Sequence, residues 1–424
     1  MADYLPRIVD TELDDLMQGL PAISLEGPKG VGKTATAQRR ARTVIALDRP
    51  AARSLLAADP ERLDSSPTPI LIDEWQRDPV AWDLVRRSVD RDSSAGRFLL
   101  TGSATPVVAP THSGAGRIVR MRMRPMTLAE RGLAETTVRL GDLLSGERSH
   151  ITGDTEVGLR TYTDEILRSG FPAIHRLPQH IGSIQLDGYL DRIVEHDFPE
   201  QGHLVRRPAT LRAWLAAYAA ATATTASYTT ILDAATPGDA DKPAKTTTIA
   251  YRDVLSQIWL LDPVPGWVPT RNPLVRLAQV PKHHLADPAL AARLVGANEK
   301  SLLAGETIGP TVPRDGTMLG ALFESLVALN LRVYAQANYA SVHHLRTHDG
   351  RHEVDFIVQR DDHKVVALEV KLAGSVGDDD VVHLRWLRDQ LGDDLLDAAV
   401  ITTGPYAYRR QDGIAVIPAS LLGP

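Results

Sequence analysis

The clearest chemical signal in the sequence is a glycine-rich segment with the spacing of a phosphate-binding loop. It reads Gly-Pro-Lys-Gly-Val-Gly-Lys-Thr and fits the pattern G-x-x-x-x-G-K-[ST] at every fixed position. Glycines let successive backbone N–H groups converge on phosphate oxygens, and a following helix points its positive end at them. An apolar strand pattern precedes the loop and an Ala-rich helix pattern follows it, which a chance glycine turn would not require. We therefore expect ATP to be bound by Gly27, Pro28, Lys29, Gly30, Val31, Gly32, Lys33 and Thr34.

The second half of such a site should be an acid at the end of a neighbouring strand. Lys33 would reach the β and γ phosphates of ATP, and the Thr34 hydroxyl would bind Mg²⁺. The apolar run 70–72 ends in Asp73 and Glu74, about forty residues after the loop. We predict that Asp73 completes the Mg²⁺ shell and that Glu74 polarises the attacking water.

Less specific candidates follow in the same region. Thr101 ends the apolar run 98–100 and could sense the γ-phosphate, or it could simply cap the next turn. Arg117 could act as an arginine finger toward the site of a neighbouring molecule. Arg120, Arg122 and Arg124 are alternatives for that role.

A second group of chemically useful residues lies near the C-terminus. In the run 365–372, Glu369 and Lys371 alternate with apolar residues, which places both on one face of a strand. If this strand forms a hairpin with 353–359, turning at 361–363, Asp355 lies opposite Glu369. Glu324, on a predicted helix, could add a third carboxylate.

This grouping suits hydrolysis of a phosphodiester. Glu324, Asp355 and Glu369 would hold Mg²⁺, which polarises the phosphate and activates water. Lys371 would orient or deprotonate that water. The alternative is an ordinary ion pair between Glu369 and Lys371 on a solvated sheet, and alternation does not decide between them. The histidines nearby have no standard zinc spacing and are interpreted as solvated structural residues: His343, His344, His348 and His352.

The elements that must position these residues fall into three parts within 424 residues. Residues 1–150 are predicted to form an α/β domain with strands at 23–25, 44–47, 69–72, 98–101 and 118–123. Residues 151–312 are predicted to be helical, with a loop at 236–245 and a helix ending near Leu261. They form either a winged-helix module or another small helical lid. Residues 313–424 resume the α/β alternation, with helices at 320–335 and 380–391 and strands at 341–345, 353–359, 365–372, 398–402 and 414–417.

Composition limits the possible classes of function. A net charge of −6 argues against a uniformly basic nucleic-acid binder, although a local basic groove remains possible. The absence of cysteine excludes disulfides, thiolate zinc sites and thiol nucleophiles. The longest apolar-looking stretch, 211–226, is interrupted by Arg212 and is shorter than a membrane span needs. We expect a cytoplasmic protein that does not contact membranes.

Taken together, the motifs resemble a prokaryotic family of AAA-superfamily P-loop ATPases. The similarity rests on the segments 27–34, 71–76, 100–103, 124–130 and 170–172. Members carry a C-terminal domain that resembles PD-(D/E)XK nucleases, and the segments 320–324, 353–356 and 369–371 fit it. The proline of that motif name is replaced here by Val354, and the middle part, including 281–284, would be a lid and winged-helix-like region.

The resemblance implies ATP and Mg²⁺ as cofactors, DNA as the expected partner, and a possible homo-oligomer formed through AAA-like domains. The leading hypothesis is an ATPase whose nucleotide state gates a nuclease. Two alternatives stay open. One is a nucleotide-switched DNA- or protein-binding regulator with an inert nuclease fold, and the other is an ATPase that remodels a protein partner.

Overall fold

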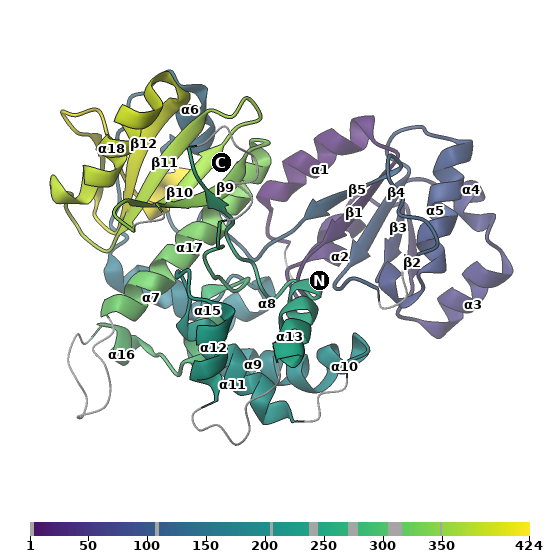
Figure 1. The fold of residues 1–424 in the computed structure, drawn as a ribbon. Coiled ribbons are helices and arrows are strands. Elements are labelled where there is room, and N and C mark those ends of the chain that lie inside the picture. Colours follow the sequence, from purple (N-terminus) through teal and green to yellow (C-terminus); the bar gives the residue numbers. More distant parts are fainter. Residues whose placement is uncertain are drawn as a thin grey trace.

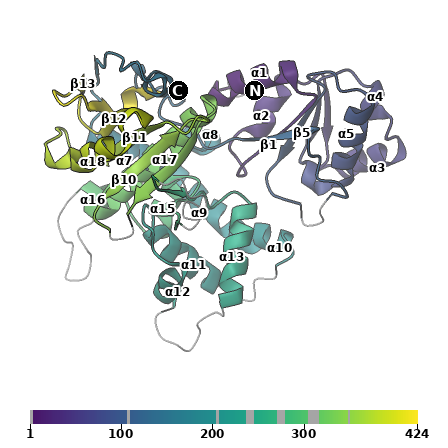
Figure 2. The same cartoon turned by 45° about the horizontal axis from the view of Figure 1, so that its top comes forward.

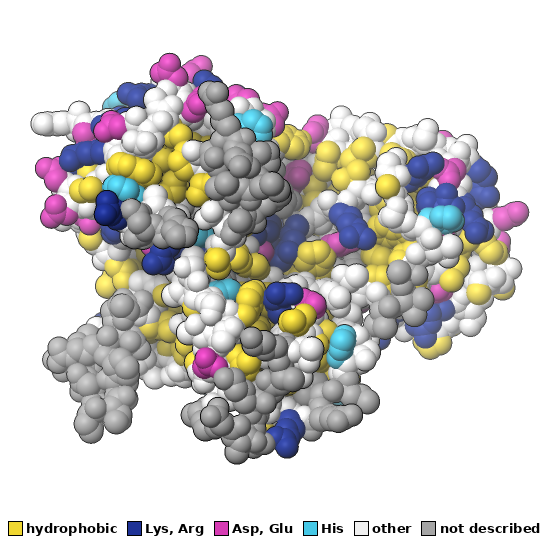
Figure 3. Space-filling view, viewed as in Figure 1, with side chains coloured by type: hydrophobic (Ala, Val, Ile, Leu, Met, Phe, Trp, Pro, Cys, Tyr) yellow, Lys and Arg dark blue, Asp and Glu magenta, His cyan; other side chains and the backbone are white. Residues whose placement is uncertain are grey.

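The structure is a computed structural model, which describes residues 4–106, 110–203, 207–236, 245–269, 279–303, 316–347 and 350–424. A parallel sheet and a mixed sheet lie on opposite sides of the molecule, with a helical region below and between them (Figures 1 and 2). On the face shown in Figure 3, lysine and arginine side chains lie in separate small groups rather than in one continuous band.

The N-terminal part is built on a five-stranded parallel sheet. Its strand order is β2-β3-β4-β1-β5, with bounds Thr43–Ala46, Ile70–Asp73, Phe98–Gly102, Ala22–Glu26 and Ile118–Arg122. Every residue of β1 and β4 is buried, because helices cover both faces of the sheet. These helices are α1 (Ile8–Gly19), α2 (Lys33–Gln38), α3 (Pro50–Ala58), α4 (Arg62–Ser65) and α5 (Val80–Arg91). The α/β class and all five predicted strands are confirmed.

The middle part is helical. Its helices are α7 (Leu159–Arg168), α8 (Pro172–His175), α9 (Gln179–Arg192), a π-helix (Ile193–Asp197), α10 (Phe198–Glu200), α11 (Pro208–Ala220), α12 (Tyr228–Ala235), α13 (Lys245–Gln257), α15 (Pro288–Leu294) and α16 (Glu299–Leu303). The predicted helix end near Leu261 is wrong, because α13 ends at Gln257 and Trp259 has a positive φ of 63°. Most of the predicted loop 236–245 lies outside the described residues.

After α13, two short segments of the chain, 261–264 and 282–285, run side by side in opposite directions and are called the antiparallel pair below. Leu261 bridges Leu285, and Val264 bridges Lys282. Helices α11, α12 and α13 followed by this pair are compatible with the winged-helix alternative, which stays a prediction. The pair matters below because it carries Lys282 toward the C-terminal sheet.

The C-terminal part is built on an eight-stranded mixed sheet in the order β7-β13-β14-β12-β11-β10-β9-β8. The central strands β9 (Ser341–Arg346), β10 (Glu353–Gln359) and β11 (Val365–Lys371) are antiparallel. Strands β11, β12 (Leu395–Thr402) and β14 (Ala415–Pro418) are parallel, with α18 (Val382–Leu391) between β11 and β12 along the chain. The predicted helices and strands of this part are confirmed, and β13 (Tyr406–Arg409) was not predicted.

Earlier segments of the chain complete this sheet. Strand β7 (Gly153–Asp154) forms one edge and β8 (Gly266–Trp267) forms the other. Strand β6 (Val138–Arg139) pairs with β15 (Leu422–Gly423), and α6 (Leu140–Ser145) follows β6 directly. The C-terminal unit is therefore assembled from segments far apart in sequence.

Helix α17 (Gly316–Ala337) runs beneath the mixed sheet and carries Glu324. Its stretch Met318–Ala337 is long and apolar enough to cross a membrane, but 67% of an 18-residue apolar segment within it is buried inside the molecule. Leu322, Phe323 and Leu326 are completely buried in the largest core cluster. The apolar character of α17 is thus accounted for by packing against the rest of the chain.

Candidate functional site

The predicted phosphate-binding loop joins β1 to α2 at the carboxyl end of the parallel sheet. Gly27 packs so closely on the end of β5 that a Cβ atom there would lie 2.1 Å from the Met123 carbonyl oxygen. Gly32 immediately precedes α2 with a φ of 103°, a conformation that favours glycine. Two of the motif glycines are therefore required by the path of the backbone itself.

Lys33 lies folded over the loop. Its ammonium donates to the carbonyl oxygens of Gly27 at 2.7 Å and Pro28 at 2.8 Å. Burial lowers the pKa of Lys33 to about 8, an effect that the charges of Glu74 and Asp73 oppose. The cation is thus held where phosphate oxygens approaching the loop would meet it.

The two acids predicted to serve ATP hydrolysis lie next to the loop. The Thr34 hydroxyl donates to the Asp73 carboxylate at 2.7 Å, which is the pairing expected of two groups that share a Mg²⁺ shell. The Thr101 hydroxyl also bonds Asp73, so it is engaged by the acid rather than by a turn. Glu74, with a φ of 54°, accepts from Gln76 at 2.5 Å and from Ser103 at 3.1 Å. The residues fit a nucleotide with Mg²⁺.

A cavity of about 540 Å³ opens beside this loop. Besides loop residues it is lined by Asp48, Glu74, Arg77 and Arg192, the last of which ends α9 in the middle part. Lys29 of the loop donates to Asp197 of the π-helix at 2.6 Å. The middle part therefore contributes both a cation to the cavity and an anion to the loop.

The predicted arginine fingers have different surroundings. Arg117 precedes β5, the strand next to β1, and lies at the amino end of the parallel strands, whereas the phosphate-binding loop lies at their carboxyl end; it is half exposed and pairs with Asp90 at 2.8 Å. It does not line the nucleotide cavity of its own chain, so any finger role would be toward another molecule, as predicted. Arg120 is exposed and pairs with Glu26 at 3.3 Å.

Arg122 and Arg124 are unsuited to a finger role, because both are committed to a buried ion cluster. Asp262 lies 3.5 Å from Arg122, 2.8 Å from Arg124 and 2.9 Å from Arg332. Burial alone would raise the pKa of Asp262, but the three guanidinium groups outweigh it and hold that pKa far below the ordinary value. The cluster joins β5 of the parallel sheet, the antiparallel pair and α17.

In the C-terminal part, strand pairing brings the predicted residues together. Phe356 pairs with Leu368 in the β10–β11 ladder, and the same register continued by one residue sets Asp355 opposite Glu369. The Asp355 carboxylate accepts from the Val370 amide at 2.9 Å, and Lys371 pairs with Glu369 at 3.0 Å. The alternative of a solvated sheet face is wrong for Glu369, which is only 6% exposed.

The structure adds a cation that no sequence pattern predicted. The ammonium of Lys282, almost completely buried, lies 2.9 Å from Glu324, 3.2 Å from Glu353 and 3.1 Å from Asp355. Burial would lower the pKa of Lys282, but the charges of Asp355, Glu324 and Glu353 raise it above its ordinary value. Burial, followed by the charge of Asp355, raises the pKa of both Glu324 and Glu369.

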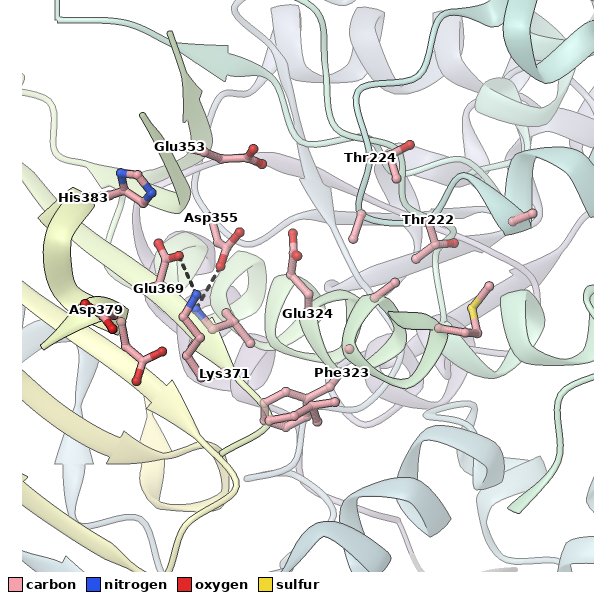
Figure 4. Close-up of a pocket in the computed structure, with 18 residues that line it drawn as sticks. Thr222, Thr224, Phe323, Glu324, Glu353, Asp355, Glu369, Lys371, Asp379 and His383 are labelled. Atoms are coloured by element: carbon pink, nitrogen blue, oxygen red, sulfur yellow. Dashed lines mark hydrogen bonds and ion pairs between the residues drawn. The ribbon is translucent and has the colours of Figure 1, made fainter. Parts of the chain in front are cut away.

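The four carboxylates and Lys371 face a cavity of about 750 Å³ between the mixed sheet, α17 and the end of α11. Figure 4 shows Asp355, Glu369 and Lys371 pointing toward one another, with Glu324 rising from α17 beside them. Within the described ranges, no three histidine or acidic side chains are placed to hold a metal ion. The predicted three-carboxylate Mg²⁺ site is therefore not formed in this arrangement.

The histidines are structural here, but not all are solvated. His344 is buried and contacts the Val280 carbonyl at 2.9 Å, and His352 stacks on Trp386 with ring centroids 4.0 Å apart. His343 contacts Ser341 at 2.9 Å, and His348 lies outside the described residues. The interpretation of His344 as solvated is wrong, because β8 and the segment before Lys282 cover it.

Three segments of the chain match known family models. Residues 20–131 match the model described as an AAA domain. Residues 159–301 and 319–422 match two models described as domains of unknown function, DUF8612 and DUF4143. The N-terminal part is thus an AAA-type P-loop ATPase domain, and the matches divide the chain into three consecutive regions.

The chain is also similar to known proteins over most of its length. It is 24% identical over 409 residues to the uncharacterized protein Rv2008c of Mycobacterium tuberculosis and, equally, to Mb2031c of Mycobacterium bovis. The alignment covers 94% of this chain and 80% of each relative. The Walker-type ATPase PABY2304 of Pyrococcus abyssi matches at 14% identity and a TM-score of 0.39, over 69% of this chain and 96% of that one.

Proposed function

We propose that this protein hydrolyses ATP and that its nucleotide state controls a Mg²⁺-dependent nuclease acting on DNA in the cytoplasm. The ATPase half rests on the AAA domain, in which Lys33 and Thr34 line one cavity and Thr34 bonds Asp73. Thr34 and Asp73 would hold Mg²⁺, which would offset negative charge on the phosphates, and Glu74 would orient water for attack on the γ-phosphate. AAA-like neighbours in a homo-oligomer would supply Arg117.

The observation that carries the nuclease half is the meeting of Asp355, Glu369 and Lys371 at one end of the β10–β11 ladder. They face a cavity that also receives Glu324 from α17. When bound there, a divalent metal ion would polarise a phosphodiester and activate water. Lys371 would orient that water and offset charge that develops on the phosphate.

The testing experiment is cleavage of supercoiled, linear duplex and single-stranded DNA in Mg²⁺ or Mn²⁺, with and without ATP. Loss of cleavage in Asp355→Ala would support the nuclease. The response of Lys33→Ala would show whether ATP controls it. Cleavage that survives Asp355→Ala would contradict the proposed site.

A specific observation favours a second candidate, a nucleotide-switched regulator of DNA or protein with an inert nuclease fold. The ammonium of Lys282 already offsets part of the negative charge of Glu324 and Asp355. Intact ATP turnover without cleavage of any substrate, in either metal, would support this candidate. Stimulation of ATP turnover by DNA would argue against a third, in which the ATPase remodels a protein partner.

A further inference from the structure

The cluster of carboxylates at the C-terminal cavity already has a cation among them, and that cation comes from another part of the chain. Glu324, Glu353 and Asp355 belong to α17 and β10, whereas Lys282 belongs to the antiparallel pair of the middle part. Its ammonium lies within 3.2 Å of all three acids, with 1% of its side chain exposed. An ammonium group so placed neutralises the same oxygens that a divalent ion would need.

The cavity still has capacity for a further cation. Among the described residues, Glu324, Glu353, Asp355 and Glu369 pair with three cations, Lys282, Lys371 and, at 4.0 Å from Glu353, Arg346. This leaves an excess of one negative charge when all are ionised. Oε2 of Glu369 is buried and has no hydrogen-bond partner among the described residues. A buried carboxylate oxygen without a partner is costly unless a cation or a proton satisfies it.

Lys282 is fixed by its backbone rather than by its side chain alone. Its amide donates to the Val264 carbonyl at 2.8 Å, and the Val264 amide donates back at 2.9 Å. The next residue, His283, donates to the Thr224 carbonyl at 2.9 Å. The ammonium therefore leaves the acids only if its buried side chain rotates out or the whole antiparallel pair shifts.

We infer that Lys282 is a tethered cation that competes with a divalent metal ion for Glu324 and Asp355 in the C-terminal cavity. In the described arrangement the lysine holds those oxygens, which agrees with the absence of a formed metal site among the described side chains. When Lys282 withdraws, Asp355 and Glu324 join Glu369 as ligands. This inference deepens the proposed nuclease function and rests on it for its biological meaning, but its test measures metal binding alone.

The experiment titrates the full-length protein with Mn²⁺, without nucleotide, and measures free Mn²⁺ by electron paramagnetic resonance. Lys282→Met should bind one Mn²⁺ at least tenfold more tightly than wild type, and Lys282→Met/Asp355→Asn should lose that gain. Lys364→Met is the matched control, since the Lys364 ammonium donates to the Asp393 carbonyl at 3.3 Å and lies at the far end of the hairpin. It should bind Mn²⁺ as wild type does.

Removal of a buried lysine could also unfold the protein, which thermal melting would reveal. In that case Lys282→Met/Glu353→Gln restores the charge balance, and its Mn²⁺ affinity is compared with that of Glu353→Gln alone. A tenfold gain in either comparison supports the inference. Unchanged or weaker Mn²⁺ binding in both comparisons overturns the inference about Lys282, whether or not DNA is cleaved. Tighter Mn²⁺ binding without any DNA cleavage overturns only the proposed nuclease activity.

Discussion

Lys29 of the phosphate-binding loop donates to Asp197 of the π-helix at 2.6 Å. Glu200, on the next helical turn, lies 3.7 Å from the same ammonium and 3.3 Å from Arg77. A cation that would otherwise face the phosphates is thus held by carboxylates of the middle part. Bound phosphate and Asp197 would compete for the Lys29 ammonium. Nucleotide binding is therefore coupled to the position of the middle part, which carries Asp197.

Asp197→Asn should therefore tighten ATP binding several-fold. The change frees Lys29 and removes a negative charge close to the phosphates. Equilibrium binding of a fluorescent ATP analogue would measure this. Asp191→Asn is the control: it also removes one negative charge, but from α9, where Asp191 pairs with the half-exposed Arg212. It should leave the affinity for ATP unchanged. Weaker binding in Asp197→Asn would mean that the contact supports the loop instead of restraining it.

ATP affinity should depend on pH because burial lowers the pKa of Lys33 to about 8. Phosphate oxygens favour the charged ammonium, so binding raises this pKa and takes up a proton above pH 8. Affinity should be constant below pH 8 and fall by up to about tenfold per pH unit above it. Titration with the same analogue between pH 7 and 9.5 checks this. Lys33→Arg stays charged throughout that range and should show a flat profile, whereas a flat wild-type profile would contradict the prediction.

Arg192 and Arg117 should differ in their effect on ATP hydrolysis. Arg192 lines the nucleotide cavity, whereas Arg117 lies at the opposite, amino end of the parallel strands. Arg192→Ala should lower kcat by at least about tenfold, since a positioned cation stabilises charge that develops on the phosphates. Arg117→Ala should matter only at protein concentrations that favour a homo-oligomer. Measuring kcat over a range of protein concentrations separates the two, and an effect of Arg117→Ala on dilute protein would be inconsistent with its position.

Asp262→Asn should destabilise the whole protein. It would leave Arg122, Arg124 and Arg332 buried together without their carboxylate, and breaking a buried ion cluster costs about 3–5 kcal/mol. Urea denaturation followed by tryptophan fluorescence measures the free energy of unfolding. Asp253→Asn, whose partner Arg252 is exposed, should change it little. Equal stability of the two variants would show that Asp262 is dispensable.

The parts of both sites that could be predicted are those fixed by short-range geometry. The phosphate-binding loop follows from glycine spacing within eight residues, and Asp355 meets Glu369 because the turn at 361–363 sets the hairpin register. Asp73 could be predicted because it ends an apolar run about forty residues after the loop, and the structure places this run as β3 in the same parallel sheet as β1.

The rest depends on tertiary packing that leaves no local pattern. Lys282 reaches Asp355 from 73 residues away, and nothing in Pro281-Lys282-His283-His284 distinguishes it from a surface lysine. Arg192 and Asp197 look like ordinary charges of a helix until the middle part is placed against the loop. Strands of two residues, such as β7 and β8, are too short for alternation to indicate them.

The two outer strands of the mixed sheet have a practical consequence for dividing the protein. Both β7 and β8 precede residue 313, although they close the sheet formed by the residues after it. A fragment that begins at residue 313 would expose the backbone N–H and C=O groups of β9 on one side and β13 on the other. Open strands of this kind pair with other chains, so the excised fragment should aggregate where the whole protein does not. Residues 313–424 therefore depend on the preceding segments to cover both edges of their sheet.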